Sequence, residues 1–148
     1  MSWTTSTEDR LQRLEDRDAI HQLFIDYGRH LDAGDWDSYA GLFVEDGEVK
    51  LGGIGKAEGR GEIRALMAGA IGDKVGGVFH LIGSPQVTLD GDSATAVVQW
   101  VAVGKAEDGA PALMSMGEHL DALTRTAEGW RIQRRTGRLS LARGYSPR

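Results

Sequence analysis

Hydrophobic residues near the start of the chain recur at the three- and four-residue spacing of an amphipathic helix. The recurring positions are Leu11, Leu14, Ile20, Leu23, Phe24, Tyr27 and Leu31. Ser6 stands where a capping side chain is favoured and Gly34 where a helix commonly stops, so the pattern predicts a helix over residues 6–33. Asp35 can cap a second, short helix that runs through Trp36, Tyr39, Leu42 and Phe43.

A small hairpin and a third helix are predicted next. The segments 48–51 and 54–58 could pair across Gly52-Gly53. Helical spacing then returns at Ile63, Leu66, Met67 and Ile71. We therefore expect a helix over residues 60–71 that ends at Gly72.

Beyond residue 77 the pattern changes to β-branched runs separated by Asp-Gly and Glu-Gly dipeptides, which is typical of an antiparallel meander. Four strands are predicted, namely Val78–Leu89, Ser93–Lys105, Ala112–Thr126 and Trp130–Ala142. These strands exceed the usual strand length, so we expect strong twist or bulges. The order of elements predicts an α+β cone-shaped barrel, with one long N-terminal helix and two shorter helices packed on a strongly curved antiparallel sheet.

Composition narrows the class of protein. The 148 residues, 41% of them hydrophobic, suit one globular domain over residues 1–148. No apolar run approaches the roughly 18 residues of a membrane span, and the N-terminus lacks a signal-peptide pattern, so we expect a cytoplasmic protein without a membrane partner. The lack of cysteine excludes disulfides and thiolate chemistry. A net charge of −5 argues against a nucleic-acid partner, although several arginines gather late in the chain.

Three segments carry a family resemblance. Residues 18–37 read DAIHQLFIDYGRHLDAGDWD, residues 42–47 read LFVEDG, and residues 125–132 read RTAEGWRI. These segments resemble SnoaL-like proteins of the nuclear-transport-factor-2-like superfamily, over nearly the whole chain. That superfamily includes dehydratases, dehydrochlorinases, isomerases and polyketide cyclases as well as non-catalytic members, so the fold does not select the reaction.

The resemblance implies an Asp–His dyad. The dyad of hexachlorocyclohexane dehydrochlorinase maps onto Asp32 and His80, and its catalytic Arg onto Arg135. In bile acid dehydratase a Tyr precedes the Asp by five residues, which gives Tyr27 here. Both matches have departures, because the dehydrochlorinase has Lys in place of Tyr27, and the further Asp and Arg of the dehydratase fall near residues 102–104 and on Ser140.

The chemistry of these side chains fits proton removal from carbon. His has an ordinary pKa near neutrality, and a carboxylate on its far nitrogen fixes the tautomer and stabilises the imidazolium. Tyr27 could donate to a carbonyl or a leaving hydroxyl, and Arg135 could stabilise developing negative charge. The leading hypothesis is a cofactor-independent lyase or isomerase, dehydratase-like, acting on a hydrophobic cyclic or polyketide-like small molecule. The alternatives are a non-catalytic small-molecule-binding or scaffold domain, and a polyketide cyclase.

Structural roles compete with these assignments. Asp32 could be a solvated turn residue, and His80 a hydrogen-bonded core residue. Tyr27 and Asp32 lie about 140° apart on a regular helix, so they share a face only if the last turn unwinds. On a regular strand Arg135 and Trp130 point to opposite faces of the sheet, because they are an odd number of residues apart. A bulge between them is needed to turn both side chains inward.

Further residues could complete the pocket. His119 could act as a second acid or base or bind the substrate, and Met116, Trp100 and Phe79 could form an adaptable apolar wall with Met67 and Met114. The histidines lack metal-ligand spacing, so we expect neither a metal nor another cofactor. The outer face of a long bent sheet can pair with another copy, so we expect a homo-oligomer, either a dimer or a trimer.

Overall fold

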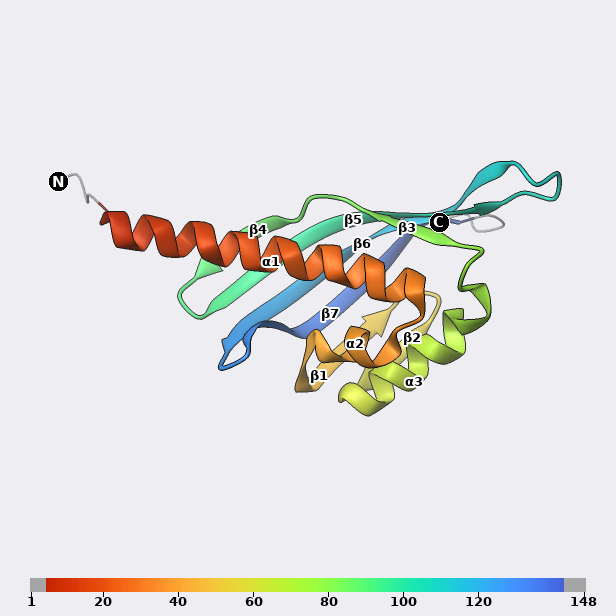
Figure 1. Cartoon of the computed structure of the whole chain (residues 1–148). Helices are drawn as coiled ribbons and strands as arrows, with labels where there is room; N and C mark the ends of the chain where they lie inside the picture. Colours follow the sequence, from red (N-terminus) through yellow and green to blue (C-terminus); the bar gives the residue numbers. More distant parts are fainter. Residues whose placement is uncertain (1–4, 143–148) are drawn as a thin grey trace.

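The computed structural model describes residues 5–142. Its helices are α1 (Thr7–Ala33), α2 (Trp36–Gly41), α3 (Arg60–Ile71) and the one-turn 3-10 helix η1 (Gly72–Lys74). Its strands are β1 (Phe43–Leu51), β2 (Gly55–Glu58), β3 (Phe79–Ile82), β4 (Gln86–Asp90), β5 (Ser93–Lys105), β6 (Pro111–Thr126) and β7 (Gly129–Ala142). The helices lie on one side of a curved sheet, which confirms the predicted α+β class (Figure 1).

The long helix α1 has the ends that its capping residues predict. The Ser6 side chain accepts a hydrogen bond from the Asp9 backbone N–H at 3.0 Å, and Gly34 ends the helix at a φ of 67°. The C-terminal half packs on the sheet, whereas the first turns project past the sheet, where Leu11 and Leu14 are exposed (Figure 1). α1 therefore carries its last turns to the mouth of the cone.

The sheet has the strand order β2-β1-β7-β6-β5-β3, and β4 also pairs with β5. Every pair is antiparallel, as predicted, except that β1 runs parallel to β7. In the chain, β1 and β7 are separated by α3 and by strands β3 to β6, so no hairpin turn joins them. A parallel pairing is possible because no tight turn forces the two strands to run in opposite directions. The sheet is consequently mixed.

The predicted strand Val78–Leu89 is two strands. β3 pairs with residues 100–103 of β5 and β4 with residues 93–97. Between them the Gly83 N–H donates to the Gln99 carbonyl at 2.8 Å, and the chain leaves the ladder at Ser84-Pro85. Because Pro has no N–H to donate, it interrupts a strand pattern that otherwise reads as continuous.

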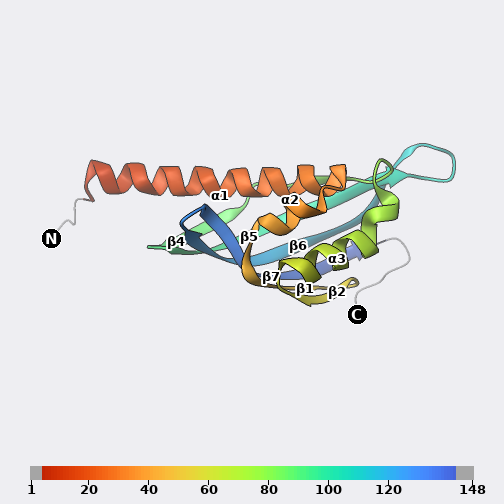
Figure 2. The same ribbon diagram turned by 60° about the horizontal axis from the view of Figure 1, so that its bottom comes forward.

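Bulges curve the long strands, as their length predicted. The register shifts between Ala102 and Val103 of β5, and at two places between β6 and β7. The sheet bends around the helices, with α1 across its concave side and α3 beside β1 and β2 (Figure 2). This curvature leaves space between the helices and the middle of the sheet.

A buried carboxylate anchors α1 to the far hairpin. Asp16 accepts two hydrogen bonds from Arg125, at 2.7 and 2.8 Å, and one from the Trp130 indole at 3.1 Å. Burial tends to raise the pKa of Asp16, but the hydrogen bonds from Arg125 and Trp130 outweigh it and hold the pKa below its ordinary value. This anchor fixes where α1 crosses the sheet.

Candidate active site

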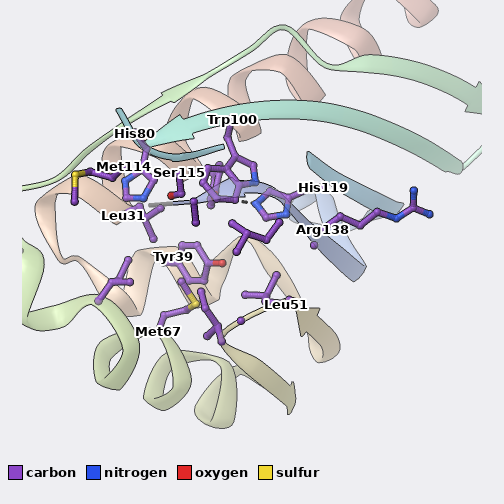
Figure 3. Close-up of a pocket in the computed structure, with 18 residues that line it drawn as sticks. Leu31, Tyr39, Leu51, Met67, His80, Trp100, Met114, Ser115, His119 and Arg138 are labelled. Carbon is purple, nitrogen blue, oxygen red and sulfur yellow. Dashed lines mark hydrogen bonds between the residues drawn. The ribbon is translucent and has the colours of Figure 1, made fainter. Parts of the chain in front are cut away.

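A cavity of about 340 Å³ lies between the inner face of the sheet and the helices. Much of its wall is apolar, with Leu31 from α1, Met67 and Ile71 from α3, Leu51 from β1 and Leu139 from β7. Polar side chains also reach it, namely Tyr27, Tyr39, His80, Trp100, Ser115 and His119 (Figure 3). An apolar wall with a few polar groups is typical of a small-molecule site.

Small residues leave room for the large side chains on the inner face of the sheet. The cross-strand pairs are His80 with Ala102, Trp100 with Gly117, and His119 with Gly137. A Cβ at Gly117 would overlap both the Trp100 ring and the Arg138 carbonyl, so only glycine fits beside the indole. The ring can therefore lie against the sheet and form part of the cavity wall.

Asp32 and His80 meet at the edge of the cavity. The His80 backbone N–H donates to both Asp32 carboxylate oxygens, at 3.0 and 3.2 Å, and His80 Nδ1 lies 2.7 Å from Asp32 Oδ1. Because a carboxylate only accepts, Nδ1 carries the proton of the neutral ring, and Nε2 has a free lone pair. His80 lines the cavity, whereas Asp32 lies behind it, with 13% and 25% of their side chains exposed.

Two N–H groups of one residue hold the Asp32 carboxylate. Asp32 lies in the last turn of α1, at the negative end of the helix dipole, and this position disfavours a carboxylate. Hydrogen bonds from the backbone and the ring of His80 offset this cost and join the end of α1 to β3. The interpretation of Asp32 as a solvated turn residue is therefore wrong.

Tyr27 contacts the other histidine of the wall. α1 stays helical to Ala33, so Tyr27 and Asp32 point in different directions, and the Tyr27 hydroxyl lies 3.0 Å from His119 Nε2. Burial raises the pKa of Tyr27 well above its ordinary value. Burial, together with the positive charge of Arg135, holds the pKa of His119 well below 6.5. Both rings are therefore neutral near pH 7.

Arg135 lies beneath the wall and does not line the cavity. A bulge at Gln133 turns Ile132 and Arg135 to the same side, which confirms the predicted irregularity. Arg135 is 0% exposed, donates to Asp121 at 2.7 and 2.9 Å, and lies 4.3 Å from the centre of the Tyr27 ring. Arg135 does not lie in the cavity as predicted, because the Tyr27 ring covers the guanidinium.

Two of the predicted wall residues lie on the outer face of the sheet. Phe79 is 54% exposed, since strand alternation turns it away from its neighbour His80. Met116 pairs with Val101 on the same outer face. A bulge in β6 turns both Met114 and Ser115 inward, and these residues line the cavity together with the predicted Trp100 and His119. The assignments of Phe79 and Met116 as substrate-binding residues are therefore wrong.

The sequence reasoning missed two polar groups of the wall. Tyr39 follows Trp36 by one helical turn, and this spacing could have indicated that it packs inward. Its hydroxyl points toward the side of the cavity where Leu51 and His119 lie (Figure 3). Ser115 carries no comparable signal, because only the bulge in β6 determines its direction.

Two features are absent from residues 5–142. No group of three or more His, Asp or Glu side chains in this range is placed to hold a metal ion. No helix there combines the length and the apolar composition needed to cross a bilayer. The expectations of a cofactor-free reaction and of a cytoplasmic location stay predictions.

Known proteins share this architecture. A family model described as a SnoaL-like domain matches residues 12–136. An NTF2-like protein with a cystatin-like fold from Novosphingobium aromaticivorans is 33% identical, with a TM-score of 0.83 over 92% of this chain and 91% of that chain. A comparison with curated proteins finds no match.

Two further solved structures carry names of enzymes. A candidate scytalone dehydratase from Novosphingobium aromaticivorans is 24% identical, with a TM-score of 0.76 over 97% of this chain and 94% of that chain. A hexachlorocyclohexane dehydrochlorinase of type 2 is 19% identical, with a TM-score of 0.78 over 89% and 90%. At these identities the likeness concerns the fold alone, and it agrees with the expected cone.

Proposed function

The chain belongs to the SnoaL-like domain family, and from this premise we propose that it is a lyase or isomerase of the dehydratase type that works without a cofactor. The proposed reaction begins when His80 removes a proton from carbon in a hydrophobic cyclic or polyketide-like small molecule. The observation that carries the proposal is the 2.7 Å contact between Asp32 Oδ1 and His80 Nδ1, with His80 at the cavity wall.

Each residue of the dyad has a defined part. His80 Nε2 takes the proton, and the Asp32 carboxylate stabilises the imidazolium that forms. The imidazolium then returns the proton, either to a leaving hydroxyl, which departs as water, or to a different carbon, which gives an isomer. Tyr27 and Arg135 act as positioning residues, because the Tyr27 hydroxyl contacts His119 and Arg135 lies beneath the Tyr27 ring.

The cavity supports a small hydrophobic substrate. The cavity volume is about 340 Å³. If each non-hydrogen atom of a ligand takes roughly the 30 Å³ of a water molecule, the cavity holds on the order of a dozen such atoms. That is the size of one or two rings. The side chains of Leu31, Met67 and Leu139 would cover the apolar part of such a molecule.

Substitutions in the dyad test the proposal. We expect Asp32→Asn and His80→Asn each to lower turnover of small cyclic hydroxyketones by about 10²- to 10⁴-fold, because each removes part of the general base. Turnover is measured from the absorbance of the conjugated product. Matched controls are Asp26→Asn and His21→Asn on the solvent side of α1, which should keep the wild-type rate. Near-normal rates in both dyad variants would overturn the proposal.

The same experiment separates the rival functions. Saturable binding without turnover by the wild type, over a panel that spans one- and two-ring compounds, would favour a non-catalytic small-molecule-binding domain. Formation of a new ring carbon–carbon bond in an open-chain polyketide analogue would favour a polyketide cyclase. In either case the dyad variants show whether Asp32 and His80 take part.

We also propose that the protein forms homo-oligomers through the outer face of its sheet. Several large apolar side chains are exposed on that face, namely Phe79, Leu81, Val97, Leu113 and Leu141. Exposed apolar side chains gathered on one sheet face are typical of a surface that another chain covers. A second copy presents the same surface, which suits a two-fold contact.

A further inference from the structure

Gly28 lies on the buried face of α1, inside the helix, where glycine is an unfavourable residue. Glycine there is destabilising relative to alanine, because it loses more backbone freedom on folding. The backbone of Gly28 is helical and its φ is not positive, so its conformation does not require glycine. The reason for a glycine at this position therefore lies in what packs against it.

The neighbour of Gly28 is Ile82 of β3. A Cβ at position 28 would lie 2.8 Å from Ile82 Cγ1, 3.7 Å from its Cδ1 and 3.9 Å from its Cβ. Carbon atoms in contact normally lie about 3.5–4.0 Å apart, so an alanine would overlap the isoleucine. Ile82 packs against the core, and its β-branched side chain is stiff at χ1. The missing Cβ therefore lets α1 and β3 approach more closely than an alanine would.

The same two elements carry the Asp–His dyad. Asp32 follows Gly28 by four residues, about one helical turn, so the two residues lie on the same side of α1. His80 precedes Ile82 by two residues and shares its face of β3. α1 and β3 therefore meet at two neighbouring places, Gly28 with Ile82 and Asp32 with His80. The separation at the first place limits the separation at the second.

The dyad tolerates little change in that separation. The His80 backbone nitrogen lies 3.0 and 3.2 Å from the two Asp32 carboxylate oxygens, and His80 Nδ1 lies 2.7 Å from Oδ1. Hydrogen bonds from N–H groups extend to about 3.2 Å. Relief of the overlap at position 28 requires a movement of about 1 Å, from 2.8 Å to a normal contact distance. If α1 moved by that distance, all three contacts would be broken.

We infer that Gly28 is a positioning residue, and that its close approach to Ile82 sets the separation at which Asp32 holds His80. The part of this inference that concerns turnover rests on the proposed function. Neither Gly28 nor Ile82 is among the described residues that line the cavity, so both act through the dyad. A side chain at position 28 should accordingly lower kcat and leave KM close to that of the wild type.

Gly28→Ala tests the inference through the His80 backbone N–H, which donates to Asp32 from a strand at the edge of the sheet. Exchange of this amide in D₂O is followed by NMR. We expect exchange to become faster by about ten- to a hundredfold, the worth of a hydrogen bond to a charged group. We expect kcat to fall by about 10²-fold, as a misplacement of about 1 Å can cause.

The matched control is Gly69→Ala, inside α3. A Cβ at this position meets nothing within 4 Å among the described residues, so the substitution adds the same methyl group without an overlap. Both His80 amide exchange and kcat should stay as in the wild type. Unchanged His80 exchange in Gly28→Ala would overturn the inference.

Substitutions at position 82 identify the cause. Ile82→Ala removes Cγ1, whereas Ile82→Val keeps a γ carbon in its place. Gly28→Ala combined with Ile82→Ala should therefore exchange at His80 as Ile82→Ala alone does. Gly28→Ala combined with Ile82→Val should exchange faster than Ile82→Val alone. If the combination with Ile82→Ala also exchanged faster than its single variant, the inference would be wrong, because the overlap would not be the cause.

The two measurements separate this inference from the proposed function. Faster His80 exchange with wild-type turnover in Gly28→Ala would uphold the spacing role and count against proton removal by the dyad. Slower turnover without faster exchange would overturn the spacing role and leave the proposed function standing.

Discussion

The two histidines of the cavity wall differ in the groups that hold them. His80 is bound through Nδ1 by the carboxylate of Asp32, and its ring lines the cavity. His119 is bound through Nε2 by the neutral hydroxyl of Tyr27, and the buried cation Arg135 lies on the far side of that tyrosine. Burial and the positive charge of Arg135 hold the pKa of His119 well below its ordinary value. His119 is therefore neutral near pH 7, and its surroundings differ from those of His80, which contacts a carboxylate at the edge of the cavity.

Removal of the Arg135 cation, which lies beneath Tyr27, tests the comparison most strongly. Arg135→Met leaves the Asp121 carboxylate buried without its partner, so we expect it to lower the free energy of unfolding by about 3–5 kcal/mol, measured by urea denaturation. The double variant Asp121→Leu/Arg135→Met should lose less than Arg135→Met alone, because no unpaired charge remains. If Arg135→Met lowered the free energy of unfolding by less than about 1 kcal/mol, as expected for an exposed ion pair, this account would be contradicted.

The pH dependence of stability tests the neutral state of His119. Its pKa lies well below 6.5 in the folded chain, because of burial and of the charge on Arg135, with His80 the other titratable group that faces it. The unfolded chain therefore takes up a proton below about pH 6.5 that the folded chain does not. Stability is fully present above that pH and falls as the pH is lowered, by at most about 1.4 kcal/mol per pH unit.

Urea denaturation between about pH 7 and pH 5 checks this prediction. His119→Gln should flatten the dependence over that range, while His21→Gln, at an exposed position, should leave it as in the wild type. Equal slopes for the wild type and His119→Gln would show that His119 takes up a proton in the folded chain.

The Asp32 contact should matter less for stability than for turnover. Asp32→Asn keeps an oxygen that can accept from the His80 backbone N–H, so we expect a loss of only about 1 kcal/mol in the free energy of unfolding. Thermal or urea unfolding measures it beside the rate assay. A loss as large as that of Arg135→Met would assign the Asp32 contact a structural role.

The smallest effect is expected on the other face of β3. Leu81 is exposed on the outer face next to His80 in the chain, so Leu81→Ser should change the unfolding free energy of a monomer by less than about 0.5 kcal/mol. Light scattering after size exclusion should nevertheless show a smaller mass if this face joins two copies. Ile82→Ser, toward the cavity side, serves as the contrasting variant that destabilises without changing assembly.

The candidate site was predictable only in part from the chain. Alternation along β3 predicts that His80 and Ile82 share a face, and alternation along the last strand predicts the bulge that turns Arg135 inward. The partner of Tyr27 was not predictable, because it lies 92 residues away on β6. Nor could spacing show that Tyr27 would cover Arg135.

Local sequence determined the ends of the elements, and tertiary structure determined which residues meet. α1 begins at the Ser6 cap and ends at Gly34, which has a positive φ. Both ends depend on contacts within a few residues, so the local sequence is enough to specify them. The parallel pairing of β1 with β7, the inward turn of Ser115 and the separation of the two histidines depend on register between distant strands. Register follows from how all the strands pack together, and no short stretch of sequence contains that information.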